Sequence, residues 1–220
     1  MDERISKVLK ALESNNMDAF YAETAAEAKA KALSLIKEGM TVAHGGSVTL
    51  KETGILDAVS CGNYNFLDRG KAKTPEELKN IYRKCFSADV YLSSANAITE
   101  NGELYNVDGT GNRIAAIAYG PDSVIIVAGK NKIVSDLDEA VIKVKSSAAP
   151  KNCVRLSKGT YCRFKGNCAA LDTGCDHSIS DITEGCRSKD RICRDYLITG
   201  IQAVKGRIKV IIVNEDLGYA

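Results

Sequence analysis

The sequence predicts an α/β fold in which a mostly parallel sheet is flanked by helices. Short apolar runs alternate with amphipathic helical segments along most of the chain, which is typical of strand–helix–strand units. The runs ADVYLS at 88–93 and SVIIVAG at 123–129 are continuous, as in strands buried on both faces. A chain of 220 residues with 45% hydrophobic residues is long enough to bury a core as one domain.

Helices and strands alternate through the first half of the chain. Apolar residues at helical spacing mark the helices, and Thr24 and Thr74 begin two of them as N-terminal caps. Pro75 at the first helical position strengthens the second of these starts. In order, we expect helices over 1–16, 24–37, 48–59 and 74–85, and strands over 40–43, near Phe66 and over 88–93.

The second half begins with a hairpin and contains one irregular region. Asn101-Gly102 stands between alternating residues, which predicts a type I′ hairpin. We then expect a helix at 113–119, the strand at 123–129, a helix that Asp136 begins and Pro150 ends, and a closing strand at 207–215. Residues 151–200 are rich in Cys, Gly and charge and show no period. We expect a loop-rich insertion there, within a single domain that spans 1–220.

Composition excludes some partners. The net charge of +2 gives no strong field, so we expect no nucleic-acid partner. Apolar runs such as VIIVA at 124–128 are far too short to cross a bilayer. The first residues form an amphipathic pattern, which differs from a secretory signal. We therefore expect a cytoplasmic protein without a membrane partner, and self-association into a homo-oligomer stays open.

The loop HGGS at 44–47 joins a strand to a helix and is a candidate anion site. Glycines leave backbone N–H groups open to a ligand, and a helix N-terminus attracts negative charge. Neighbouring hydroxyls and a histidine add hydrogen-bonding groups. A phosphate, a carboxylate or an acyl-CoA group would suit this loop, whereas a tight turn with a serine cap explains it equally well. The candidate ligand-binding residues are His44, Gly45, Gly46, Ser47 and Thr49.

Glu100 directly precedes the Asn101-Gly102 turn. In a plain hairpin it faces solvent, which is the simpler interpretation. A second polar loop follows and leads into a helix. The further candidate ligand-binding residues are Asn101, Asp108 and Asn112. Open α/β sheets bind ligands beyond the carboxyl ends of their strands, so we expect these loops and HGGS to meet there. A carboxylate at that edge can act as nucleophile or general base.

Four blocks of the sequence resemble one family: GGSVTLKETGI, SSANAITENGELYNVDGTGNRIAAIAYGP, VAGKNKIV and SAAPKN. Together they are similar, over almost the whole chain, to the LUD-domain family of lactate-utilisation proteins (the LutC-like type). The resemblance implies the NagB/RpiA/CoA transferase-like fold. In CoA transferases of this fold, a Ser-Glu-Asn-Gly motif carries a glutamate that forms an acyl-thioester-exchange intermediate. The stretch 99–102 is similar to it, with Thr for Ser, so the resemblance implies a catalytic Glu100 beside Asn101.

The resemblance also implies a function. We expect a protein of lactate or organic-acid metabolism that binds a small anionic metabolite or a CoA-type ligand at the HGGS and ENG loops. No second half of a CoA-transferase active site is visible, so whether the protein is an enzyme stays open. The alternative is an accessory or electron-transfer subunit of an iron–sulfur lactate oxidation complex, with an iron–sulfur protein as partner. A metabolite sensor with a structural zinc is a third interpretation.

Six of the eight cysteines fall between 153 and 193. In a reducing compartment, such clustering favours metal or redox roles over structural disulfides. Four of them resemble the four-cysteine tail of many family members, with an insertion that carries Cys175 and His177. Four thiolates can hold Zn²⁺ or an iron–sulfur cluster, whereas free buried thiols or a redox-labile disulfide are the alternatives. The predicted ligands are Cys162, Cys168, Cys186 and Cys193, and we expect Cys61, Cys85 and Cys153 to be core residues.

Overall fold

The central element of the structure, a computed structural model that describes residues 2–173 and 178–219, is a six-stranded sheet. Its strands follow the order β1-β10-β7-β4-β2-β3, and all neighbouring strands run parallel. They are β1 (Asp18–Ala22), β2 (Thr41–His44), β3 (Asn65–Leu67), β4 (Val90–Ser93), β7 (Ser123–Gly129) and β10 (Ile208–Val213). The predicted α/β class with a mostly parallel sheet is confirmed.

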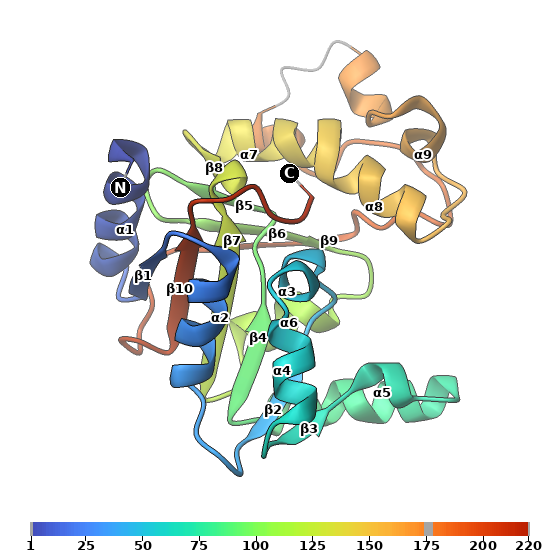
Figure 1. Ribbon diagram of the computed structural model, residues 1–220. Helices are drawn as coiled ribbons and strands as arrows, with labels where there is room; N and C mark the ends of the chain where they lie inside the picture. The colour runs from blue at the N-terminus through green and yellow to red at the C-terminus, as the bar shows by residue number, and fades with distance from the viewer. Residues whose placement is uncertain (1, 174–177, 220) are drawn as a thin grey trace.

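A second sheet lies beyond the carboxyl ends of β4 and β7 and is drawn above the first sheet in Figure 1. Its order is β8-β5-β6-β9, in which β6 pairs antiparallel with both β5 and β9. The strands are β5 (Ala97–Thr99), β6 (Leu104–Asp108), β8 (Ile133–Val134) and β9 (Asp195–Thr199). Because β5 follows β4 and β8 follows β7 after short connections, the two sheets meet at one edge.

Helices cover both faces of the main sheet (Figure 1). The apolar faces of α1 and α6 pack on one side, and those of α2 and α4 pack on the other. The helices are α1 (Glu3–Ser14), α2 (Ala25–Ser34), α3 (Val48–Glu52), α4 (Ile55–Cys61), α5 (Pro75–Lys84), α6 (Asn112–Ala118), α7 (Leu137–Lys143), α8 (Ala149–Arg155) and α9 (Tyr161–Lys165). The predicted caps Thr24, Thr74 and Asp136 each accept a backbone N–H bond at a helix start.

Three elements differ from the prediction. The helix expected over 48–59 is divided into α3 and α4 by Gly54, which has a left-handed φ of 66°. Pro150 does not end a helix, because a π-helical turn over Val144–Ala148 joins α7 to α8. Pro150 then lies in the first turn of α8, where its missing N–H is tolerated. The strand β1 was not predicted; within the described ranges it is an edge strand whose single neighbour is β10.

The ENG hairpin is present, but its turn is not the predicted type I′. Only Gly102 has a positive φ, of 81°, whereas type I′ also requires one at Asn101. Gly102 N–H donates to the carbonyl of Thr99, and Thr99 N–H donates to that of Glu103, as in a three-residue loop that ends in a left-handed glycine. A Cβ on Gly102 would lie 2.7 Å from the carbonyl carbon of Ala11. Contact with α1 therefore fixes this turn.

The irregular region 151–200 contains more order than a loop. It begins within α8, includes α9, and ends with β9, which pairs with β6 from Asp108↔Asp195 to Leu104↔Thr199.

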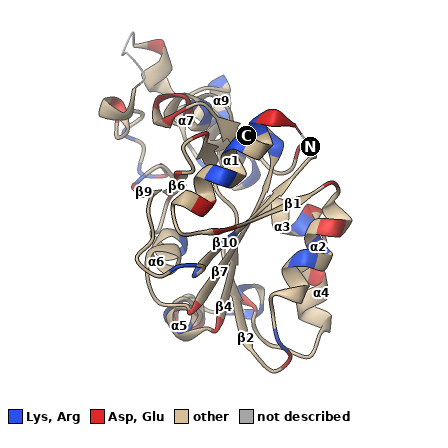
Figure 2. Cartoon of the chain, turned by 90° about the vertical axis from the view of Figure 1, so that its left-hand side faces the viewer, with Lys and Arg blue, Asp and Glu red and all other residues tan. Residues whose placement is uncertain are grey.

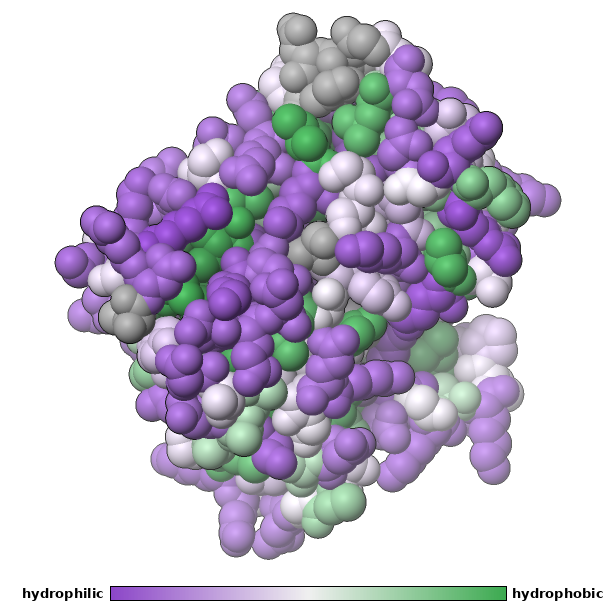
Figure 3. Space-filling view, turned by 45° about the horizontal axis from the view of Figure 1, so that its top comes forward, coloured by the Kyte–Doolittle hydropathy of each residue, from purple (hydrophilic) through white to green (hydrophobic). Residues whose placement is uncertain are grey.

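On the surface of the molecule, charges of both signs are intermixed on the side shown in Figure 2. Hydrophilic side chains predominate on the face in Figure 3, where apolar ones form small separate groups. No helix in the described ranges is long and apolar enough to cross a membrane.

Candidate functional site

A cleft of about 610 Å³ opens at the edge where the two sheets meet. This volume is in the range of small-molecule sites, and carboxyl ends of parallel strands are where such sites form. Its walls come from the HGGS loop, α5, the segment after β4, the loop between β6 and α6, α8, and the segment 189–194. The cleft therefore draws on both sheets and on the irregular region.

The HGGS loop and the loop at 108–113 lie together in this cleft. A Cβ on Gly45 would lie 2.9 Å from Cγ and Cδ of Arg113, and one on Gly46 would lie 3.4 Å from Nη1 of Arg69. The two glycines thus allow two arginine side chains to approach the backbone of the loop.

Arg113 joins the inner walls of the cleft. Its guanidinium donates hydrogen bonds of 2.6–3.1 Å to the side chains of Asn96 and Asn106 and to the carbonyls of Ser94 and Val107. Burial lowers the pKa of Arg113, and the nearby Asp108 carboxylate raises it in part. Asp108 itself accepts the backbone N–H of Arg113 at 3.0 Å. The two Nη atoms of Arg113 therefore hold the segment after β4 and the end of β6 together at the floor of the cleft.

Lys132 is a buried cation, only 4% exposed, on the floor of the cleft. Its Nζ donates to Thr49 Oγ1 at 3.0 Å, Ser94 Oγ at 2.7 Å and the carbonyl of Ala95 at 3.1 Å. Burial, with the positive charge of Arg113, lowers the pKa of Lys132 to about 7, although the Glu52 carboxylate raises it in part. In the described part of the chain no carboxylate lies within salt-bridge distance of it. The amine can therefore gain or lose a proton near neutral pH.

The segment after β10 covers Lys132. Gly218, with a left-handed φ of 69°, packs against Thr49 so closely that any Cβ would collide with the Thr49 hydroxyl. The same Cβ would lie 3.3 Å from Lys132 Nζ. Gly218 N–H donates to Glu52 Oε2 at 2.6 Å, and the neighbouring Tyr219 lines the cleft. This contact limits the access of water to the amine.

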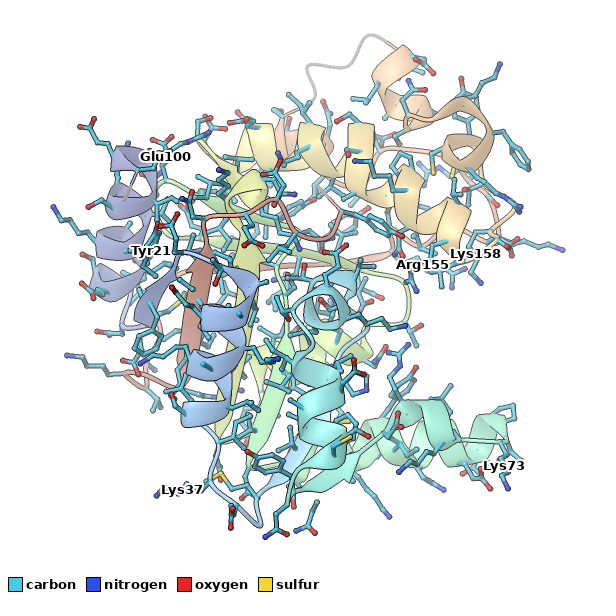
Figure 4. The ribbon with its side chains drawn as sticks, viewed as in Figure 1. Tyr21, Lys37, Lys73, Glu100, Arg155 and Lys158 are labelled. Carbon is cyan, nitrogen blue, oxygen red and sulfur yellow. The ribbon has the colours of Figure 1, made fainter. Side chains whose placement is uncertain are left out.

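The rim of the cleft is strongly cationic. Figure 4 shows Arg155 and Lys158 at the end of α8, on the side of the cleft. Within the described ranges, no cation of the cleft lies within salt-bridge distance of a carboxylate. The lining acids Asp108 and Asp190 instead accept backbone N–H groups. The cations that line the cleft are Arg69, Arg113, Lys132, Arg155, Lys158, Lys189, Arg191 and Arg194.

The predicted ligand-binding residues fall into two groups. Gly46, Ser47, Thr49, Asp108 and Asn112 line the cleft, whereas His44, Gly45 and Asn101 do not. The His44 ring stacks on Phe66 with centroids 5.4 Å apart, and burial lowers its pKa. Ser47 Oγ accepts the N–H of Leu50 and so caps α3. Since α3 has only five residues, anion attraction in the cleft rests on side-chain cations and not on this helix end.

Glu100 lies away from the cleft, beside α1 (Figure 4). Its carboxylate accepts hydrogen bonds from Lys7 Nζ at 2.6 Å and Arg4 Nε at 2.7 Å. Lys7, followed by Arg4, lowers the pKa of Glu100. Asn15 Nδ2 also donates to the carbonyl of Asn101 at 3.0 Å. In this structure the ENG turn anchors α1.

The four predicted metal ligands lie around one small cavity of about 20 Å³, together with Cys153. The Sγ atoms of Cys153 and Cys162 are 3.6 Å apart. Among the described residues, no group of three or more His, Cys, Asp or Glu side chains is placed to hold a metal ion. Cys85 is buried and Cys61 is exposed, so only the former is a core residue. Cys175 and His177 lie outside the described residues.

The prediction from sequence missed most of the cleft cations. Lys132 follows β7 in the stretch GKNKIV, and its place after a central strand is the signal that could have found it. Arg155 and Lys158 gave no such signal, because charged residues at a helix end are usually solvated. Their position over the cleft depends on the continuation of α7 into α8.

The solved structures that align with this chain share little sequence with it. A DUF162 family protein from Deinococcus radiodurans aligns with a TM-score of 0.50 and 14% identity, covering 96% of both chains. Ribose 5-phosphate isomerase A from Methanocaldococcus jannaschii has a TM-score of 0.35 and 16% identity, over 60% of this chain and 64% of that one. The eIF2B delta subunit from Chaetomium thermophilum has a TM-score of 0.34 and 19% identity, over 59% and 50%.

The family relationship follows from a match along the chain itself. No curated protein matches the sequence. The LUD domain model matches residues 5–213, which include both sheets and every element of the cleft from the HGGS loop to β10. The chain belongs to the LUD-domain family.

Proposed function

We propose that the cleft binds a small anionic metabolite of organic-acid or CoA type. The observation that carries this proposal is Lys132, a buried cation with three hydrogen-bond acceptors and no carboxylate partner in the described ranges. A buried charge without a counter-charge is costly. A protein that keeps this buried cation and several more exposed ones around one cleft attracts anions into it.

The floor and the rim suit different parts of one ligand. The floor offers the Lys132 amine with the hydroxyls of Thr49 and Ser94, which suit a carboxylate or a carbonyl oxygen. The rim offers Arg155, Lys158 and Lys189, whose charges suit phosphate groups. An acyl or carboxylate head with a phosphate-bearing remainder, as in an acyl-CoA, uses both regions. A free organic acid uses the floor alone.

Lys132 gives the site a group for acid–base chemistry. Its pKa of about 7 makes the ammonium and the amine similarly populated at neutral pH, which suits proton transfer to or from a bound carbonyl compound. We place such a step in the metabolism of lactate or a related organic acid, in keeping with the family. Glu100 has no part in it, because its carboxylate is ion-paired with α1.

Ligand binding to a Lys132→Met variant tests the proposal. Lactate, pyruvate, CoA, acetyl-CoA and inorganic phosphate are titrated by calorimetry into the wild-type protein and the variant. Methionine keeps the apolar stem and removes the charge. We expect at least a tenfold loss of affinity for every ligand that the wild type binds, equivalent to about 1.4 kcal/mol.

Lys130→Met is the matched control. Lys130 is an exposed neighbour whose Nζ contacts Asn214 at 3.3 Å, outside the cleft, so its loss should leave affinity unchanged. Equal binding by wild type and Lys132→Met would refute the role of the lysine. Absence of binding for all five compounds would refute the ligand class.

A further inference from the structure

The three groups that contact the Lys132 amine are all uncharged. Its Nζ lies 3.0 Å from Thr49 Oγ1, 2.7 Å from Ser94 Oγ and 3.1 Å from the carbonyl oxygen of Ala95. A carbonyl oxygen can only accept a hydrogen bond, whereas a hydroxyl can accept or donate one. The surroundings therefore satisfy the ammonium, which donates three times, and also the free amine, whose lone pair can accept a hydroxyl hydrogen.

A free amine on the floor of the cleft is a nucleophile. Burial and the charge of Arg113 lower the pKa of Lys132 to about 7, although Glu52 raises it in part. Part of the protein therefore carries the unprotonated amine at neutral pH. In the described ranges, no carboxylate lies within salt-bridge distance to hold the proton on it. The cleft of about 610 Å³ that Lys132 lines has room for a small carbonyl compound beside the amine.

Arg69 brings a guanidinium to the same cleft from the 3₁₀ turn that follows β3. Its guanidinium carbon lies 5.7 Å from the centre of the Tyr82 ring on α5, which is within the range of a cation–π interaction. Among the described residues, no carboxylate lies within salt-bridge distance of it. Its N–H donors can therefore pair with the carboxylate of a ligand.

The two cations approach the same short segment of chain. Arg69 lies beside Gly46, where a Cβ would be 3.4 Å from its Nη1, and Lys132 donates to Thr49, three residues further on. An amine and a guanidinium so arranged suit a carbonyl group that is next to a carboxylate. We propose that Lys132 forms a covalent imine with an α-keto acid, whose carboxylate Arg69 binds. This inference rests on the proposed function, because it uses the same cleft, and it adds the ligand class and the reaction.

Imine formation needs no further reactant. Lys132 Nζ attacks the carbonyl carbon, an N–C bond forms, and the electron pair of the C=O π bond moves to the oxygen. This oxygen takes a proton from the nitrogen, relayed by the hydroxyl of Ser94 or Thr49, to give a carbinolamine. The nitrogen lone pair then forms the C=N bond as the C–O bond breaks. The oxygen takes the second proton of the original amine and leaves as water.

Borohydride reduction tests the imine, because it converts an imine into a stable secondary amine. The wild-type protein is incubated with pyruvate and reduced, and its peptides are analysed by mass spectrometry. We expect a carboxyethyl group on Lys132. Lactate, which has a carboxylate but no carbonyl group, should leave no adduct. Lys132→Met should lose the adduct, whereas Lys130→Met, at an exposed lysine outside the cleft, should keep it. The peptide map of the wild type assigns the lysine even if Lys132→Met fails to fold.

Arg69→Met tests the recognition of the carboxylate. Loss of the guanidinium should raise the pyruvate concentration that gives half-maximal adduct by at least tenfold, equivalent to about 1.4 kcal/mol. Acetone, a ketone without a carboxylate, should give the same concentration dependence in the variant and the wild type. An unchanged dependence on pyruvate would overturn the role of Arg69.

Calorimetry separates the failure of this inference from the failure of the proposed function. A wild-type protein that binds any of the five ligands titrated above, but forms no adduct on Lys132, would refute the imine and leave anion binding in place. Labelling of Lys130 to the same extent as Lys132 would also refute it, since the reaction would then be that of any exposed lysine. If no ligand binds and no adduct forms, both proposals are refuted.

Discussion

The ENG turn and the floor of the cleft each hold a charged side chain of a type that takes part in catalysis, but the surroundings of the two charges differ. Glu100 is paired with two cations of α1, whereas Lys132 is buried among hydroxyls and a carbonyl. The Glu100 carboxylate, which two side chains of α1 neutralise, holds the ENG turn against that helix. A buried ammonium with no carboxylate within salt-bridge distance in the described ranges is available for an anionic ligand, so the comparison favours the cleft over the ENG turn as the binding site.

The largest effect is expected from removal of Arg113, the half-buried cation that also lines the floor of the cleft. Arg113→Ala would remove four hydrogen bonds from the floor of the cleft and leave Asn106 Oδ1 without its donor, so we expect a loss of about 3–5 kcal/mol in the free energy of unfolding. Urea denaturation measures it, with Arg113→Lys as a control that keeps the charge and should lose less. A loss below about 1 kcal/mol would show that the floor is not organised by Arg113.

The burial of Lys132 can be tested by the pH dependence of the free energy of unfolding. Its pKa is about 7 in the folded chain and about 10.4 when unfolded. Between these values the unfolded chain binds more protons, so raising the pH should stabilise the wild type, by at most roughly 1.4 kcal/mol per pH unit. Lys132→Met should lack this slope and be at least as stable near pH 7. Parallel curves from about pH 7 to about pH 10 for the two proteins would contradict the assignment.

The smallest effect is expected at Glu100. Glu100→Gln removes the charge that Lys7 and Arg4 contact, and exposed ion pairs contribute little. We expect a decrease of no more than a few degrees in the melting temperature and no change in ligand affinity. Since the folded pKa is lowered, the contribution is present above the unfolded pKa and disappears as the pH falls through the folded one. A large loss of affinity would restore Glu100 to the site.

The elements that could be predicted are those whose signals are local. The run at 123–129 became β7, and the side chains of Thr24, Thr74 and Asp136 all cap helices. Elements set by distant contacts could not be predicted. The strand β1 has no alternating pattern and owes its conformation to pairing with β10.

In the candidate site, too, only the features with local sequence signals could be predicted. That HGGS and the loop at 108–113 lie together follows from the rule for strand ends, and the structure agrees. The partners of Glu100 lie 93 and 96 residues away in sequence, so no local pattern could reveal that its charge is neutralised. Lys132 looks like a solvated lysine in GKNK, because its burial depends on the segment that ends at Gly218.

The position of β10 affects how the molecule assembles during synthesis. This strand lies between β1 and β7, although it is translated after both of them. While the ribosome is still adding residues before Ile208, the N-terminal strand has no neighbour to pair with, and β7 exposes an unpaired edge to other nascent chains. We therefore expect β1 to join the sheet late, after β10 has been synthesised.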